Sequence, residues 1–211
     1  MSHRLVEVPA DRLERWVIGF GERHGAVAAR PGLERVRLQA ADGALAELEV
    51  PWRPWPVPSS ADTSLVVRVL VRHVLRSRTL GLLLVRRGGW AVGTCRDGQV
   101  LTHKAGSRYV QSRTAAGGWS QQRYARRRTG QADALAGSVV EASLDRLRAD
   151  GLDGLVVGGD RQLVRVVLDD RRLAALAALP RSPLLEVPDP KGAVLAQVAR
   201  RTLAIRVRIT D

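Results

Sequence analysis

One segment of the chain combines glutamine and arginine side chains with small residues and contains no acid. Between Asp97 and Asp133 there is no carboxylate, and we call residues 98–132 the acid-free segment. Its centre has the order Gly117-Gly118-Trp119-Ser120-Gln121-Gln122-Arg123. Its basic residues are Lys104, Arg108, Arg113, Arg123, Arg126, Arg127 and Arg128. A solvated face normally mixes both signs of charge, so this segment is typical of a polyanion-binding site.

The glutamines of this segment could position a small reactant. A glutamine amide does not titrate and is no strong base, but it can hold a water molecule or an oxyanion by hydrogen bonds. An ester on an RNA platform needs little more, because orienting one water molecule near the acyl carbon can remove up to about 7–11 kcal/mol of the barrier. Arginines three and four residues apart share a helix face, so Arg123, Arg126 and Arg127 are expected to bind neighbouring phosphates.

Residues for other catalytic chemistries are missing or scattered. The single Cys95 excludes an intramolecular disulfide and a multi-cysteine metal site, and Gly-x-Ser-x-Gly is absent. The turn Gly158-Gly159-Asp160 lacks the frame of a phosphate-binding loop, and we predict a strand-to-helix turn with Asp160 as N-cap. No two-histidine metal spacing occurs among His3, His24, His73 and His103. We therefore expect neither metal nor cofactor.

The elements on either side of the glutamines must position them. Gly106, Gly117 and Gly118, with small residues between, predict a mobile loop that reaches outward. Before the loop, residues 80–86, 90–95 and 99–109 predict a three-stranded meander. After it, the pattern predicts a long helix that carries Arg126 to Arg128 on its first turns and runs to residue 150, with Gly151 as its C-terminal cap.

The remaining C-terminal sequence alternates between strand and helix patterns. A strand at 155–157 is followed by helical segments, a strand at 184–187, a helix at 192–201 and a last strand at 205–209. Strands that alternate with helices after a meander indicate an α/β fold, with a mixed sheet flanked by helices.

The N-terminal part predicts a small region of its own. A helix at 11–24 precedes a hairpin that turns at Asp42-Gly43. Four prolines in residues 51–60 predict a linker. We expect Trp52 and Trp55 to pin this linker against the core. Residues 65–78 favour a helix. The expected division is 1–50 for the helix and hairpin, 51–60 for the linker and 61–211 for the α/β domain.

Composition sets the broad class of the protein. With 211 residues and 45% apolar composition, the chain can bury one main core and a lesser one. A net charge of +13 and a pI near 11.5 fit a protein that meets phosphate backbones. Apolar runs are far shorter than the roughly 20 residues that cross a bilayer. We expect a soluble, cytoplasmic protein with no membrane partner, and the oligomeric state stays open.

Three motifs together resemble a known family. Residues 108–111 (Arg108-Tyr109-Val110-Gln111), 117–128 and 157–161 (Val157-Gly158-Gly159-Asp160-Arg161) are similar to the actinobacterial branch of the Vms-like release factors. These are relatives of the middle domain of eukaryotic and archaeal peptide-chain release factors. The resemblance runs from about residue 80 to the C-terminus.

The resemblance implies an RNase-H-like α/β fold and peptidyl-tRNA hydrolysis on stalled large ribosomal subunits, in ribosome-associated quality control. The expected partners are the large subunit, its ribosomal RNA and peptidyl-tRNA. Release factors proper place glutamine directly after the two glycines, whereas here Trp119 and Ser120 follow Gly117-Gly118. The Gly/Ser/Gln order of the Vms-like group assigns the catalytic position to Gln121, with Gln122 beside it as the alternative.

Two other functions stay open at this point. The acid-free segment could belong to a non-catalytic module that binds ribosomes or RNA. An RNase-H-like nuclease would instead need carboxylates such as Asp97, Asp153 and Asp160 to converge on a divalent metal ion.

Overall fold

The computed structural model describes residues 3–107 and 120–210, and only the backbone of His3 and of residues 120–132. The fold is mixed α/β, with two sheets and, in these ranges, six α-helices. Two compact units make up the chain. The first unit comprises Met1–Ser77 and Arg200–Asp211, and the second comprises Arg78–Ala199.

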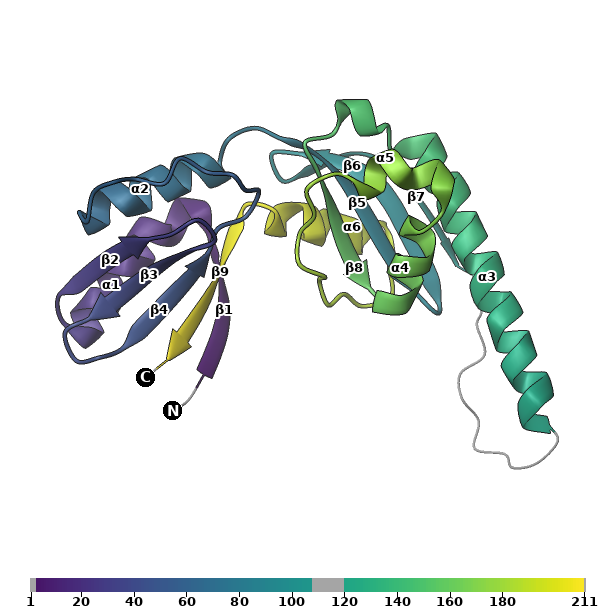
Figure 1. Ribbon diagram of the computed structural model, residues 1–211, viewed down its shortest axis with the longest axis horizontal. Coiled ribbons are helices and arrows are strands. Elements are labelled where there is room, and N and C mark those ends of the chain that lie inside the picture. The colour runs from purple at the N-terminus through teal and green to yellow at the C-terminus, as the bar shows by residue number, and fades with distance from the viewer. Residues whose placement is uncertain (1–2, 108–119, 211) are drawn as a thin grey trace. The chain divides into compact units, whose positions relative to one another are not determined.

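The first unit contains an antiparallel sheet closed by the C-terminal strand. The strand order is β1-β9-β4-β3-β2, so β9 lies between the first strand of the chain and the predicted hairpin (Figure 1). The bounds are β1 His3–Pro9, β2 Val27–Pro31, β3 Arg35–Ala40, β4 Leu45–Glu49 and β9 Ala204–Thr210. The last predicted strand therefore exists, but it pairs with β1 and β4 instead of joining the meander.

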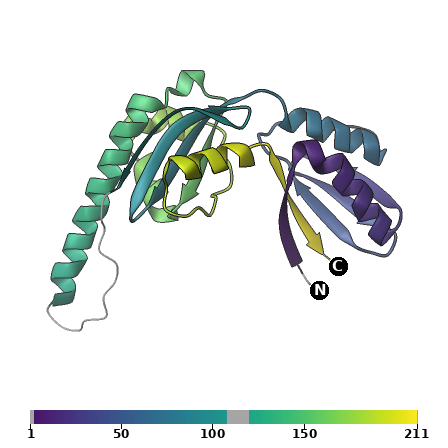
Figure 2. The same cartoon turned by 180° about the vertical axis from the view of Figure 1, so that it is seen from behind.

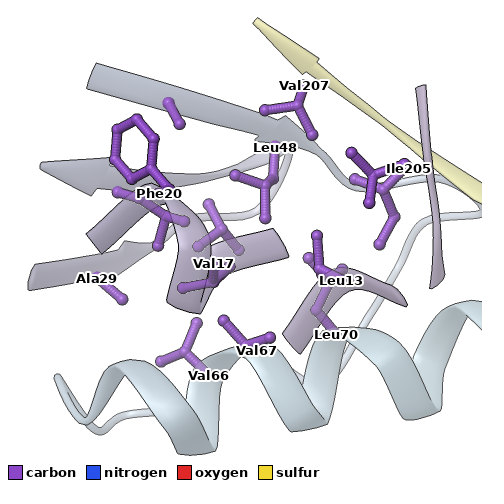
Figure 3. Close-up of a cluster of buried hydrophobic side chains, with 14 of the residues drawn as sticks. Leu13, Val17, Phe20, Ala29, Leu48, Val66, Val67, Leu70, Ile205 and Val207 are labelled. Atoms are coloured by element: carbon purple, nitrogen blue, oxygen red, sulfur yellow. The ribbon is translucent and has the colours of Figure 1, made fainter. Parts of the chain in front are cut away.

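Two amphipathic helices cover one face of this sheet. A 3₁₀ turn at Ala10–Arg12 leads into α1 (Leu13–His24), and α2 is Thr63–Val74. Figure 3 shows side chains from both helices and from the strands meeting in one apolar core. Both predicted helices and the hairpin exist, because their apolar periodicity corresponds to the buried faces, but the helix predicted at 65–78 begins at Thr63 and ends at Val74.

The proline-rich stretch before α2 packs against the first unit. Trp55 is buried and its indole N–H donates to the carbonyl oxygen of Gly32 at 3.0 Å. The ring of His73 bonds through Nε2 to the carbonyl oxygen of Pro51 at 2.9 Å. The prediction that tryptophan pins this stretch is confirmed for Trp55. The boundary between the two units lies after Ser77, because α2 and β9 complete the N-terminal core. The expected division was 1–50, 51–60 and 61–211.

The second unit is built on a four-stranded sheet in the order β7-β6-β5-β8. β5 (Thr79–Arg86), β6 (Gly89–Arg96) and β7 (Gln99–Ser107) form the predicted antiparallel meander, and β8 (Gly154–Gly159) runs parallel to β5. Helix α4 lies in front of this sheet in Figure 1, and α6 lies in front in the reversed view of Figure 2, so the two cover opposite faces. The helices are α3 Ser120–Arg146, α4 Arg161–Leu168, α5 Ala174–Ala177 and α6 Gly192–Arg201.

One predicted strand and one predicted helix end in this unit are wrong. Residues 184–187 form no strand, and only isolated bridges join Leu155 to Arg181 and Gly158 to Leu185. Prolines at 180, 183 and 188 interrupt any continuous ladder there. The long helix ends at Arg146 and not at residue 150, and Gly151 closes a separate 3₁₀ turn instead of capping it.

Candidate functional site

The acid-free segment spans the end of β7 and the beginning of α3. β7 ends at Ser107 and α3 begins at Ser120. Residues 108–119 lie outside the described residues, and with them four predicted site residues: Arg108, Arg113, Gly117 and Gly118.

Helix α3 starts at the motif that carries the predicted catalytic glutamines. Its N-terminal part extends past the sheet in both Figure 1 and Figure 2. The first α3 side chain described as buried is Leu135, which lies about 21 Å along the helix axis from position 121. The predicted site residues on this extension are Ser120, Gln121, Gln122, Arg123, Arg126, Arg127 and Arg128. The structure thus places both glutamines on a helix end, well away from the sheet.

The first turn of a helix favours negative charge. Its backbone N–H groups lack intrahelical acceptors, and the helix dipole adds a partial positive charge there. Gln121 and Gln122 occupy the second and third positions of α3. Single substitutions at each of the two positions test their roles separately.

The C-terminal half of α3 fixes this extension to the second unit. Leu135, Val139 and Val140 are buried in its core, and the Ser143 hydroxyl donates to the Val139 carbonyl at 2.8 Å. These contacts lie against β6, β7 and α4. A helix held along half its length can carry the other half outward as a rigid arm.

Ion pairs add to this attachment on the exposed side of α3. Arg172 Nη1 lies 2.6 Å from Glu141 Oε1, and Arg172 Nη2 lies 3.0 Å from Asp170 Oδ2. Hydrogen bonds from the Arg172 side chain and backbone hold the pKa of Asp170 below its usual value. Lys104 Nζ on β7 lies 3.5 Å from Asp145 Oδ2.

Gly106 belongs to β7 and not to the predicted loop. It pairs with Trp90 across the sheet, and a Cβ atom there would lie 2.6 Å from Cζ2 of the indole. Trp90 itself is buried. The expectation that Gly106 adds reach is therefore wrong, because its missing side chain makes room for the indole. The strand that leads into the glutamine motif is paired with β6 up to this point.

The other nucleophilic and acidic groups are engaged elsewhere. Burial raises the pKa of the Cys95 thiol to about 11, which leaves it protonated and unreactive at neutral pH. Asp160 Oδ1 accepts from the N–H groups of Gln162 and Leu163, so its predicted N-cap role is confirmed. Asp153 Oδ2 accepts from the N–H of Thr79 at 2.8 Å. In the described residues, no group of three or more acidic, histidine or cysteine side chains could hold a metal ion. Asp97 therefore belongs to no such group.

A cavity of about 520 Å³ opens at the carboxyl ends of the parallel strands β5 and β8. Its arginines are already used: Arg86 Nη1 donates to the Val187 carbonyl at 2.8 Å, and Arg87 Nε lies 3.6 Å from Asp160 Oδ2. The lining residues are Arg86, Arg87, Gly88, Gly159, Asp160, Glu186, Val187 and Asp189. Gly159 and Asp160 of the turn considered in the sequence analysis lie in this lining, whereas no motif indicated the segment 186–189, which reaches the cavity only through the fold.

Among the helices of the described ranges, none combines the length and apolar character that a bilayer crossing requires. Among curated proteins no match to the chain was found. A solved structure titled "Vms1 mitochondrial localization core" is similar over 93% of this chain and 80% of its own, with 10% identity and a TM-score of 0.43.

The sequence also matches a described protein family. Residues 78–208 match the actinobacteria/chloroflexi VLRF1 release factors. This match includes the glycine–glutamine motif and confirms the resemblance found there. Because it extends over more than half of the 211 residues, the chain belongs to the actinobacteria/chloroflexi VLRF1 release factor family.

Proposed function

We propose that this protein is a peptidyl-tRNA hydrolase that releases nascent chains from stalled large ribosomal subunits. The observation that carries the proposal is the position of Gln121 and Gln122 on the first turn of α3, which extends beyond the sheet. Membership of a release factor family supports the reaction class. The acid-free sequence around both glutamines supports a negatively charged partner such as ribosomal RNA and transfer RNA.

Each part of the acid-free segment has a separate role in this proposal. Gln121 holds the attacking water near the ester carbonyl, and the N–H groups of the first helical turn favour the developing oxyanion. Arg108, Arg113, Arg123 and Arg126 to Arg128 bind phosphates and fix the register on RNA. Gly117, Gly118 and Ser120 let the chain approach the ester closely.

The wider setting of the proposal follows from the family resemblance. The protein acts in the cytoplasm, in ribosome-associated quality control, with an RNase-H-like second unit and with Gln122 as the alternative catalytic position. It uses no metal or cofactor, since water is oriented and not ionised. Because glutamine does not titrate, the release step should vary little between pH 6 and pH 8.

The test uses large subunits that carry peptidyl-tRNA. We expect wild type to release peptide and Gln121→Ala to lower the rate by about 100-fold or more, as loss of one oxyanion-stabilising donor does. Gln131→Ala, further along the same helix, is the matched control and should keep the rate. An ester left intact by wild type, or full rates for both Gln121→Ala and Gln122→Ala, would contradict the proposal. Tight binding without release would favour the alternative, a non-catalytic ribosome- or RNA-binding module.

A further inference from the structure

Helix α2 of the first unit carries a row of arginines on its outer side. Arg68 and Arg72 of α2 are exposed and lie four residues apart, about 6 Å along the helix axis, and Arg76 is exposed two residues past the helix end at Val74. The opposite side of α2 is committed to the core, where Val66, Val67, Leu70 and Val74 are buried. The arginines therefore contribute nothing to the packing that holds the helix in place.

Within the described residues, the fold provides no partner for the two charges on α2, those of Arg68 and Arg72. In the part of the chain that the structure describes, the guanidinium groups of Arg68 and Arg72 have no hydrogen bond or ion pair. No carboxylate occurs in the sequence between Asp62 and Asp97. Like charges four residues apart destabilise a helix, so Arg68 and Arg72 lower the stability of α2.

On two other surfaces of the same unit, arginines have acidic neighbours. On the uncovered face of the sheet, Glu47 lies 3.0 Å from Arg37, 3.5 Å from Arg35 and 4.0 Å from Arg208. Helix α1 and the turn before it interleave both signs along the sequence: Asp11, Arg12, Glu14, Arg15, Glu22 and Arg23. An arginine-rich composition would affect all three surfaces equally, so composition does not explain the row on α2.

We propose that the outer face of α2, which carries Arg68 and Arg72, binds the phosphate backbone of RNA. This is a second RNA contact that goes beyond the proposed function and lies outside the residues matched to the family. Guanidinium groups bind phosphate oxygens in a bidentate fashion, and a regular row suits a repeating polyanion. A lipid surface fits less well, because the core holds Val66, Val67, Leu70 and Val74, and the exposed Leu65 and Leu75 do not form the continuous apolar face with which a helix inserts into lipid.

The experiment compares two double variants of the full chain with equal loss of charge. Arg68→Gln with Arg72→Gln removes the row, and Arg15→Gln with Arg23→Gln removes two exposed arginines from α1 in the same unit. Binding is measured by fluorescence anisotropy with a labelled RNA hairpin at several salt concentrations. We expect the α2 variant to bind on the order of tenfold more weakly at about 0.1 M salt, with a log–log salt slope smaller by about 1.4–1.8. The α1 variant should stay close to wild type.

Equal affinities for the two variants would overturn the inference. The inference would also be overturned if wild type bound poly-glutamate as tightly as RNA and the α2 variant lost affinity for both equally. The face would then accept any polyanion. Thermal unfolding checks the fold, and the α2 variant should be at least as stable as wild type because like charges are removed. Gln121→Ala should keep its affinity for the hairpin, so failure of the hydrolysis proposal is visible separately from failure of this one.

Discussion

Gly106 offers a sharp test of how the strand before the glutamine motif is held. In Gly106→Ala, the new Cβ would lie 2.6–2.9 Å from Cζ2, Cε2 and Nε1 of Trp90. Carbon atoms in contact normally sit about 3.5–4.0 Å apart, so the indole or the strand must move by about 1 Å. Trp90 is buried and has little room to do so. Overpacking of this kind costs about 1–3 kcal/mol.

The measurement is urea unfolding followed by circular dichroism, with Gly137→Ala as the matched control. A Cβ at Gly137 meets nothing within 4 Å, and the residue lies inside α3. Alanine there should raise the free energy of unfolding by about 0.5–1 kcal/mol, because glycine weakens helix interiors. Glycine-to-alanine substitution is thus expected to lower the free energy of unfolding at position 106 and to raise it at position 137.

A second background identifies the cause of the loss at Gly106. With Trp90→Leu, the atoms that clash are removed, so Gly106→Ala should cost clearly less there than in wild type. A wild-type urea midpoint for Gly106→Ala, or an unchanged cost when the indole is gone, would contradict a clash with Trp90. The second outcome would place the strain in the backbone of β7 and not in its contact with Trp90.

Two further predictions concern residues whose roles are structural. Asp160→Ala removes the acceptor for the N–H groups of Gln162 and Leu163, and the midpoint of unfolding should show a loss of about 1 kcal/mol, whereas Asp160→Asn should recover most of it. Cys95 should react with a thiol reagent at pH 7–8 only after unfolding, because burial raises its pKa to about 11; rapid labelling of the native protein would contradict that burial.

The local elements could be predicted from the sequence because their signals are local. The alternation of apolar residues around Asp42-Gly43 gave the hairpin, and the three- and four-residue spacing of Leu13, Val17 and Phe20 gave α1. Alternation shows which face of a strand is buried but not which strand lies beside it. For this reason β9 was assigned to the wrong sheet, although its residues were correctly expected to form a strand.

The candidate site divides in the same way. The charge pattern and the glycine–glutamine order could be found in the sequence, and so could the helix that follows them. The role of Gly106 could not, because a strand glycine packed under an indole has the same sequence appearance as a loop glycine. The cavity beside Asp160 was equally hidden, since its acidic lining comes from segments that the fold alone brings together.

Charge and packing change at the same place along α3, and this links the fold to the proposed chemistry. The first acidic residue of the helix is Asp133, and the first described buried residue is Leu135. After this point, Glu141 and Asp145 pair with cations of the second unit. Before it, the sequence is basic and the helix extends past the sheet. A carboxylate on the extended half would repel phosphate, whereas one on the packed half binds the helix to its own unit. The acid-free segment therefore ends where α3 begins to pack against its own unit, and the RNA contact that we propose lies on the half before this point.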